Sequence, residues 1–228
     1  MARFISVRLV IGFGALVFAA LAFLIFAKEY KAFYAGAGMD VQFYIVADDA
    51  FAARPYGLQS TAREIERCFG GMQRLQNGVL NGALKARGYQ ACLSVAQGIL
   101  ARSPTHGAAH QLRAESLYAL GDAARAMQAA AQAARAAPNS AWLAQRRLAL
   151  LLAPPLQRDV AMAALADADL VKLMRLHGPR AWLAGIYASD TRLRPIVARN
   201  QAQISADDAA QFLRAVRGAM AAMQSGAR

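Results

Sequence analysis

The chain has 228 residues, of which 57% are hydrophobic and 18% are charged, and its formal net charge is +12. Soluble domains typically contain about 25% charged and ~45–50% apolar residues. This composition excludes an intrinsically disordered or collagen-like chain, and two cysteines are too few for a disulfide scaffold. It indicates a helical protein that places part of its apolar surface in lipid.

A short N-terminal tail, residues 1–8, precedes a long apolar segment. Residues 9–27 are 19 consecutive uncharged residues between Arg8 and Lys28. A helix of that length spans about 28 Å, close to the ~30 Å hydrocarbon core of a bilayer. A buried helix of a soluble protein rarely keeps so long an uncharged run. The segment is therefore predicted to be a single membrane-spanning helix.

A cleaved signal peptide is the main alternative for the same segment. The apolar core of a signal peptide is only about 7–15 residues long. Cleavage after Ala27 would place the large Ile25 at the −3 position, and the small-x-small run 35–37 lies well beyond the apolar segment. An uncleaved anchor is therefore favoured.

The charges that flank the predicted span do not by themselves decide its orientation. Arg3 and Arg8 precede it, Lys28 and Lys31 follow it, and the positive-inside rule leaves the two sides nearly balanced. The short N-terminal tail favours a cytoplasmic N-terminus. We therefore predict a single-pass protein of a bacterial inner membrane with a periplasmic C-terminal domain.

Residues 28–57 form a membrane-proximal segment that is rich in aromatic side chains. Seven of the 19 aromatic residues lie here: Tyr30, Phe33, Tyr34, Phe43, Tyr44, Phe51 and Tyr56. The run 41–46 is compatible with a short strand or an interfacial helix, because the spacing of its apolar residues does not distinguish between the two. The segment is predicted to pack on the helical domain or to lie at the bilayer surface.

Residues 58–228 are alanine-rich, and glycine and proline signals divide them into helices. Breaks are expected at 70–71, 88, 103–104, 121–122, 138–139, 154–155 and 178–179. The predicted helices are 61–69, 72–87, 89–102, 108–120, 123–136, 141–152, 158–166, 170–176, 180–188 and 206–223. Ser205 followed by Asp207 and Asp208 is typical of a helix start. The last helix is amphipathic, with Phe212, Val216, Ala219 and Met220 on one face.

Pro104 and Pro138 lie 34 residues apart, and each follows a predicted alanine-rich helix, which suggests a repeated unit. The intervening sequence places small residues where two helices would cross and a Gly-Asp turn between them. The positions that carry the pattern are Ala114, Leu117, Tyr118, Gly121, Asp122, Ala126, Met127 and Ala133. With these residues the chain resembles the tetratricopeptide repeat family.

The resemblance is clearest over residues 105–138 and degenerate in the units on either side, within about 72–153. It implies an all-α fold: the membrane helix followed by a right-handed solenoid of helical hairpins that ends in a C-terminal capping helix. Two features depart from the family pattern. Arg113 replaces an expected leucine, and His110 takes the place of an aromatic residue of the first helix.

No motif predicts catalysis, and no cofactor is expected. His106 and His110 have the spacing of two ligands on one helical face, but the intervening residues lack the glutamate of a metalloprotease. We predict no metal site there. Asp167 and Asp169 would point to different sides of a helix, and no phosphate-binding loop or nucleophile motif is present.

Cys68 and Cys92 lack the spacing of a zinc or thioredoxin-like centre. A disulfide would be possible in an oxidising periplasm. The predicted helix 72–87, about 24 Å long, would place the two residues far apart, however. An unbridged pair is therefore favoured.

Charge is the remaining functional signal. Residues 58–228 contain 21 lysines and arginines against ten acidic residues. Such a surface attracts anionic lipid or an acidic protein or polymer. A solvated, evenly spread arginine excess explains the charge equally well. Nucleic-acid binding is not expected, because no recognition motif accompanies the charge.

The first functional hypothesis is a non-catalytic interaction or assembly protein that binds another membrane or envelope protein. The repeat resemblance implies that His110, Gln111, Arg113 and Tyr118 line its partner-binding surface. A structural accessory subunit of a larger membrane complex is the second hypothesis. A basic module that binds anionic lipid or polymer is the third.

Overall fold

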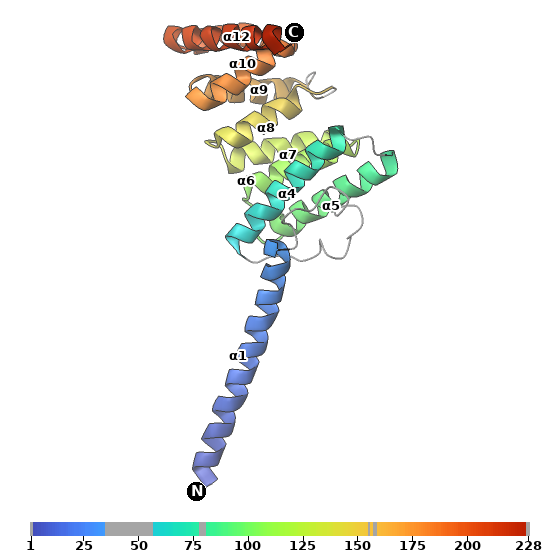
Figure 1. The fold of residues 1–228 in the computed structure, drawn as a ribbon, viewed down its shortest axis with the longest axis vertical. Coiled ribbons are helices and arrows are strands. Elements are labelled where there is room, and N and C mark those ends of the chain that lie inside the picture. The colour runs from blue at the N-terminus through green and yellow to red at the C-terminus, as the bar shows by residue number, and fades with distance from the viewer. Residues whose placement is uncertain (1, 35–56, 78–80, 155, 157–158, 227–228) are drawn as a thin grey trace. The chain divides into compact units, whose positions relative to one another are not determined.

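The computed structural model describes residues 2–34, 57–77, 81–154, 156 and 159–226. These residues are helical, with no strand among them, and they divide into two compact units, one within residues 1–102 and one within 103–228 (Figure 1). The all-α prediction is confirmed. Most of the predicted segment 28–57, namely residues 35–56, lies outside the described residues.

The first unit begins with α1, an unbroken helix from Ala2 to Tyr34 that contains the apolar run 9–27. Large apolar side chains are exposed along it: Phe13, Leu16, Val17, Phe18, Leu21, Phe23, Leu24, Ile25 and Phe26. Residues 9–11 of the predicted span fall outside the residues whose side chains are described. Within the described part of the chain, no helix combines the length and apolarity needed to cross a membrane.

Helices α4 (Leu58–Asn77) and α5 (Gly82–Leu100) pack against each other as a hairpin. The predicted helix 72–87 and the breaks at 70–71 and 88 are wrong. Helix α4 continues through Gly70 and Gly71, because burial of this stretch outweighs the ~1 kcal/mol penalty of a helical glycine. The signal for the start of α5 is Asn81, whose side chain accepts a hydrogen bond from the backbone N–H of Leu84 at 2.9 Å.

The hairpin also corrects the prediction for the cysteines. Cys68 on α4 and Cys92 on α5 form a disulfide, with their Cα atoms 5.6 Å apart. Gly88 allows the two helices to approach closely, because a Cβ atom there would lie 2.5 Å from a methyl group of Leu75. Because α4 and α5 pack against each other, two residues that a single continuous helix would have separated lie together.

The second unit contains seven α-helices in its described residues. They are α6 (Gly107–Ala119), α7 (Ala123–Ala136), α8 (Ala141–Leu151), α9 (Val160–Met174), α10 (His177–Ser189), α11 (Leu193–Asn200) and α12 (Ala206–Gly226), with a short 3₁₀ turn, η2 (Gln201–Gln203), before the last. Helix α6 packs on α7, α8 on α9, and α10 on α12. Contacts also link α6 to α8 to α10, and α7 to α9 to α12. Apart from α11, which packs on α9 and α10, the unit is thus built from three helix pairs in two rows.

Local signals set most of these boundaries. The side chains of Asp122, Ser140, Asp159 and Ser205 each accept a backbone N–H at a helix start. Gly121 adopts φ +86° between α6 and α7, a conformation that favours glycine. The predicted bounds of the helices 108–120, 123–136 and 141–152 are confirmed to within one residue.

Three later predictions are wrong. The predicted helices 158–166 and 170–176 are replaced by a single helix, α9, which runs from Val160 to Met174 without a break at Asp167 and Asp169. Gly178 and Pro179 lie in the first turn of α10, where proline needs no hydrogen-bonded N–H. Helix α11 was not predicted, because it has only eight residues and contains Pro195, a residue type that usually marks the end of a helix.

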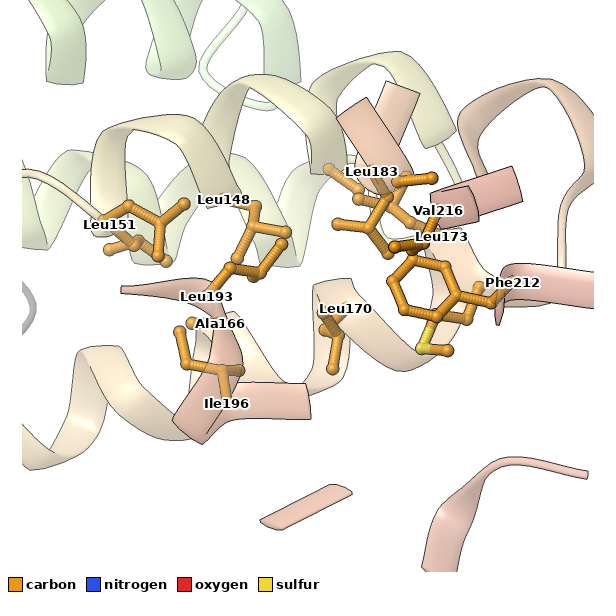
Figure 2. Close-up of a cluster of buried hydrophobic side chains, with 14 of the residues drawn as sticks. Leu148, Leu151, Ala166, Leu170, Leu173, Leu183, Leu193, Ile196, Phe212 and Val216 are labelled. Carbon is orange, nitrogen blue, oxygen red and sulfur yellow. The ribbon is translucent and has the colours of Figure 1, made fainter. Parts of the chain in front are cut away.

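The core of this unit is an aliphatic cluster contributed by α8 to α12 (Figure 2). Leu148, Leu170, Leu173 and Leu183 have no exposed surface. The last helix adds Phe212 and Val216, as predicted, while Ala219 is half-buried and Met220 remains 47% exposed. Burial of large side chains from five helices fixes how these helices pack.

Candidate functional site

The row formed by α6, α8 and α10, called here the first-helix row, carries the most connected polar surface near the predicted site residues. Glu115 of α6 accepts two hydrogen bonds from the Arg146 guanidinium of α8, at 2.9 and 2.5 Å. Gln111, one turn before Glu115, donates to the same carboxylate at 2.9 Å. The side chains of Glu115 and Arg146 remain 14% and 27% exposed. This cluster joins two neighbouring hairpins at a partly solvated surface.

A second set of polar contacts lies at the C-terminal ends of the same helices. The Tyr118 hydroxyl donates to the Pro154 carbonyl at 2.7 Å, and Arg192 donates to the Leu152 carbonyl at 2.9 Å. Arg192 also binds Asp190, and its hydrogen bonds hold the pKa of that carboxyl below its usual range. These bonds satisfy carbonyl groups that follow α8 and therefore hold the row together.

The four residues predicted to line the partner surface do not form one exposed patch. Tyr118 donates to the Pro154 carbonyl beyond α8, and Gln111 donates to Glu115 within α6. His110 is 9% exposed, and its Nε2 lies 2.7 Å from the Pro104 carbonyl oxygen. Arg113 is half-buried, with its Nε enclosed and without a partner among the described residues. Gln111 is fully buried, and its Oε1 has no partner there either.

Sequence reasoning missed Glu115 and Arg146. Glu115 stands four residues after Gln111 and therefore on the same side of α6, a spacing that could have been noticed. Arg146 sits 31 residues further along, on α8, the first helix of the next pair. Only a model of how successive hairpins pack would have paired it with Glu115.

A buried ion pair lies deeper, between α8 and α9. Arg147 donates to both oxygens of Asp169, at 2.8 and 2.7 Å, and neither side chain is more than 2% exposed. Asp167, two residues earlier, binds Arg199 and Asn200 of α11. The two aspartates thus point to different sides of α9, as predicted. Because Arg147 and Asp169 are enclosed, this pair organises the fold and offers no surface to a partner.

The histidine pair is used in building α6. His106 caps the helix by accepting the N–H of Ala109 at 3.2 Å, and His110 braces the preceding loop through Pro104. Burial lowers the pKa of His106. In the described residues no group of three or more potential ligands is arranged to hold a metal ion.

The first unit contains a buried carboxylate of another kind. Glu64 of α4 is 5% exposed, and burial raises its pKa from 4.5 to about 7. Arg67 and Arg102 lower the pKa in part, and Glu29 of α1 raises it. Glu29 itself accepts hydrogen bonds from the Gly57 backbone N–H at 2.8 Å and from the Ser60 hydroxyl. The end of α1 and the start of α4 therefore share a cluster of acidic groups.

The charges of the second unit are unevenly matched. Residues 103–228 contain 15 lysines and arginines against eight aspartates and glutamates. All eight carboxylates bind a side chain or cap a helix. Arg135, Arg194, Arg214 and Arg217 are exposed and form no ion pair with the described residues. The net field of this unit is positive and favours anionic partners.

Comparison with protein-family models, curated proteins and solved structures finds no match for this chain.

Proposed function

We propose that this chain is a non-catalytic, membrane-anchored interaction protein of a bacterial envelope complex, and that it binds a partner through a tetratricopeptide-like helical domain. The observation that carries the proposal is the pair of rows in the second unit. Each first helix contacts both the second helix of its own pair and the first helix of the next pair. Stacked pairs of this kind present one row of helices as an extended binding surface.

The anchor is proposed from the sequence of α1. The 19 uncharged residues 9–27 lie within one unbroken helix, and large apolar side chains are exposed around it. An exposed apolar helix is costly in water and stable in a hydrocarbon core. We place this helix in the bacterial inner membrane as a single pass.

The disulfide supports a periplasmic position for the C-terminal domain. Disulfides persist in oxidising compartments such as the periplasm and are rare in the cytosol. The bridge between Cys68 and Cys92 lies beyond the anchor, in the part of the chain that the short N-terminal tail also favours placing outside the cytoplasm. Two independent features thus support the same orientation.

The partner surface is proposed to be the exposed side of the first-helix row. Arg146 supplies N–H donors there, and Glu115, which accepts two of its hydrogen bonds, positions the guanidinium. The positive field of the unit supports an acidic partner segment, since a planar guanidinium binds carboxylates in a bidentate manner. The non-catalytic assignment is supported by the carboxylates of this unit, which cap helices or bind neighbouring side chains, and by His106, which caps α6.

One observation favours the accessory-subunit alternative. The polar groups of the first-helix row bind one another, with Arg146 on Glu115 and Tyr118 on Pro154. A repeat stack that only packs within a larger complex would show the same contacts. A module for anionic lipid or polymer is the third candidate, favoured by the exposed arginines.

Affinity purification of the full-length chain in mild detergent, with cross-linking and mass spectrometry, tests the proposal. We expect one stoichiometric envelope protein, cross-linked to α6 and α8. Arg146→Gln should weaken its recovery, whereas Arg199→Gln, which removes another exposed ion-paired arginine, should not. Cross-links to α1 as strong as those to α6 and α8 would favour the accessory subunit. A solitary protein at physiological salt would contradict both.

A further inference from the structure

The C-terminal part of α1 is joined to the start of α4 by the carboxylate of Glu29. One oxygen accepts the backbone N–H of Gly57 at 2.8 Å, and the other accepts the hydroxyl of Ser60. Ser60 is 2% exposed, and it also donates to the Gly57 carbonyl at 3.0 Å. A carboxylate at the start of a helix is favoured by the helix dipole and by the open N–H groups there. The contact therefore connects two elements that are 28 residues apart in the chain.

The position of Glu29 relative to the apolar run sets the depth of this contact. Glu29 follows Ala27, the last residue of the run, by two positions, or about 3 Å along a helix. The headgroup layer on each side of a bilayer is roughly 5–7 Å thick. If residues 9–27 fill the hydrocarbon core, Glu29 lies in that layer. The hydrogen bond then brings Gly57 to the same depth.

If Gly57 lies in the headgroup layer, the adjacent Leu58 lies at that depth as well. It is the first residue of α4 and follows Gly57 directly, yet 86% of its surface is exposed. A leucine so exposed is unfavourable in water and gains free energy at the boundary between headgroups and acyl chains. Among the large hydrophobic side chains described outside α1, only Val160 of the other unit is equally exposed.

We propose that the N-terminal end of α4 rests in the headgroup layer of a phospholipid bilayer, with Leu58 in contact with lipid and Glu29 holding that end in place. The inference rests on the proposed membrane anchor and deepens it. The hairpin of α4 and α5 is then held to the anchor by the hydrogen bonds that Glu29 accepts at the N-terminal end of α4. The apolar surface of α1 and the exposed Leu58 are in this way parts of one lipid-facing surface.

The test places a photo-crosslinking amino acid at Leu58 in the full-length chain, reconstituted in vesicles of phosphatidylcholine and phosphatidylglycerol. The matched position is Gln76, which is exposed near the other end of α4. We expect at least about fivefold more lipid adduct at position 58, because 18 residues of helix put position 76 about 27 Å away. Equal adducts at both positions, or protein adducts in place of lipid at position 58, would overturn the proposal.

A second variant tests the role of Glu29. Glu29→Ala should reduce the lipid adduct at position 58, whereas Glu66→Ala, which removes an exposed carboxylate from the same α4, should leave it unchanged. An unchanged adduct in Glu29→Ala would refute the holding role. Alkaline carbonate extraction distinguishes failure of the proposed anchor from failure of the Leu58 contact alone. Release of the chain from the vesicles would overturn the anchor itself, and retention without an adduct at position 58 overturns this inference alone.

Discussion

At the scale of single residues, Glu64 is the group whose environment has the clearest measurable consequence. Its pKa is raised from 4.5 to about 7, mainly by burial. A raised carboxyl pKa means that the folded state holds the proton more tightly than the unfolded state. The associated stability is therefore fully present below about pH 4.5 and is lost as the pH rises through about 7.

We expect Glu64→Gln to remove this pH dependence. The neutral amide resembles the protonated acid, so the variant should gain up to ~3 kcal/mol over the parent at about pH 8 and little at about pH 4. Urea unfolding of the detergent-solubilised chain, monitored through hydrogen exchange of the α4 and α5 amides, provides the measurement. Glu66→Gln alters an exposed carboxylate and should leave the profile unchanged. A parent whose stability does not fall between these pH values would contradict the prediction.

Asp169 and Asp167 provide a second comparison at this scale. Asp169→Ala leaves the fully buried Arg147 without its carboxylate and should cost about 3–5 kcal/mol in the free energy of unfolding. Asp167→Ala breaks a partly exposed pair with Arg199 and should cost roughly 1 kcal/mol or less. Urea unfolding monitored by tryptophan fluorescence measures both, since Trp142 and Trp182 lie in this unit. Equal costs would show that the buried pair does not hold α8 to α9.

At the scale of elements, two glycines should respond to alanine in opposite ways. Gly121 adopts φ +86° between α6 and α7, so Gly121→Ala should destabilise the unit by about 1–2 kcal/mol. Gly218 lies inside α12, and a Cβ atom there would meet nothing within 4 Å. Gly218→Ala should therefore stabilise by about 0.5–1 kcal/mol. Thermal unfolding of the two variants and the parent measures both changes in stability. Changes of the same sign in the two variants would contradict the prediction.

The predicted and observed elements agree where one local signal controls the boundary. Asp122, Ser140 and Ser205 cap helices whose starts could be read from the sequence. Agreement fails where packing overrides the signal. Gly70 and Gly71 were expected to end a helix, but Gly71 is buried in the middle of α4. Glycine lowers helix propensity by only about 1 kcal/mol, and side-chain burial along one face exceeds that.

At the scale of the whole molecule, the disulfide bears both on local stability and on the proposed membrane orientation. Reduction of the bridge between Cys68 and Cys92 opens a loop with a sequence separation of 24 residues and should destabilise α4 and α5 by about 3 kcal/mol. If the C-terminal domain is periplasmic, as proposed, the bridge is expected to form in the cell. Thiol labelling of the protein, taken directly from cells with and without reduction, measures its state.

The double variant Cys68→Ser/Cys92→Ser is the control for that experiment. It should give no labelling, and its α4 and α5 should exchange hydrogen at the rate of the reduced parent. Free thiols in the parent before reduction would contradict a periplasmic C-terminal domain. Slow exchange in the double variant would show that helix packing alone holds the hairpin together.

The surface proposed for the partner was only partly open to prediction from the sequence. Tyr118, expected on it, is partly buried and donates to the Pro154 carbonyl, whereas Gln111, also expected there, is fully buried and donates to Glu115 of its own helix. His110 is instead bonded to its own preceding loop. Glu115 and Arg146 had no local signal, because their relation depends on how one hairpin stacks on the next.

The sequence by itself determined the apolar run of residues 9–27, the all-α class, and the bounds of the helices from 107 to 151. These features depend on hydrophobicity, helix propensity and capping groups, which act over a few neighbouring residues. The tertiary structure alone decided the disulfide, the pairing of Arg147 with Asp169, and the contact of Glu29 with the start of α4. Each joins residues more than 20 positions apart, so each depends on where the chain reverses and which helix faces meet.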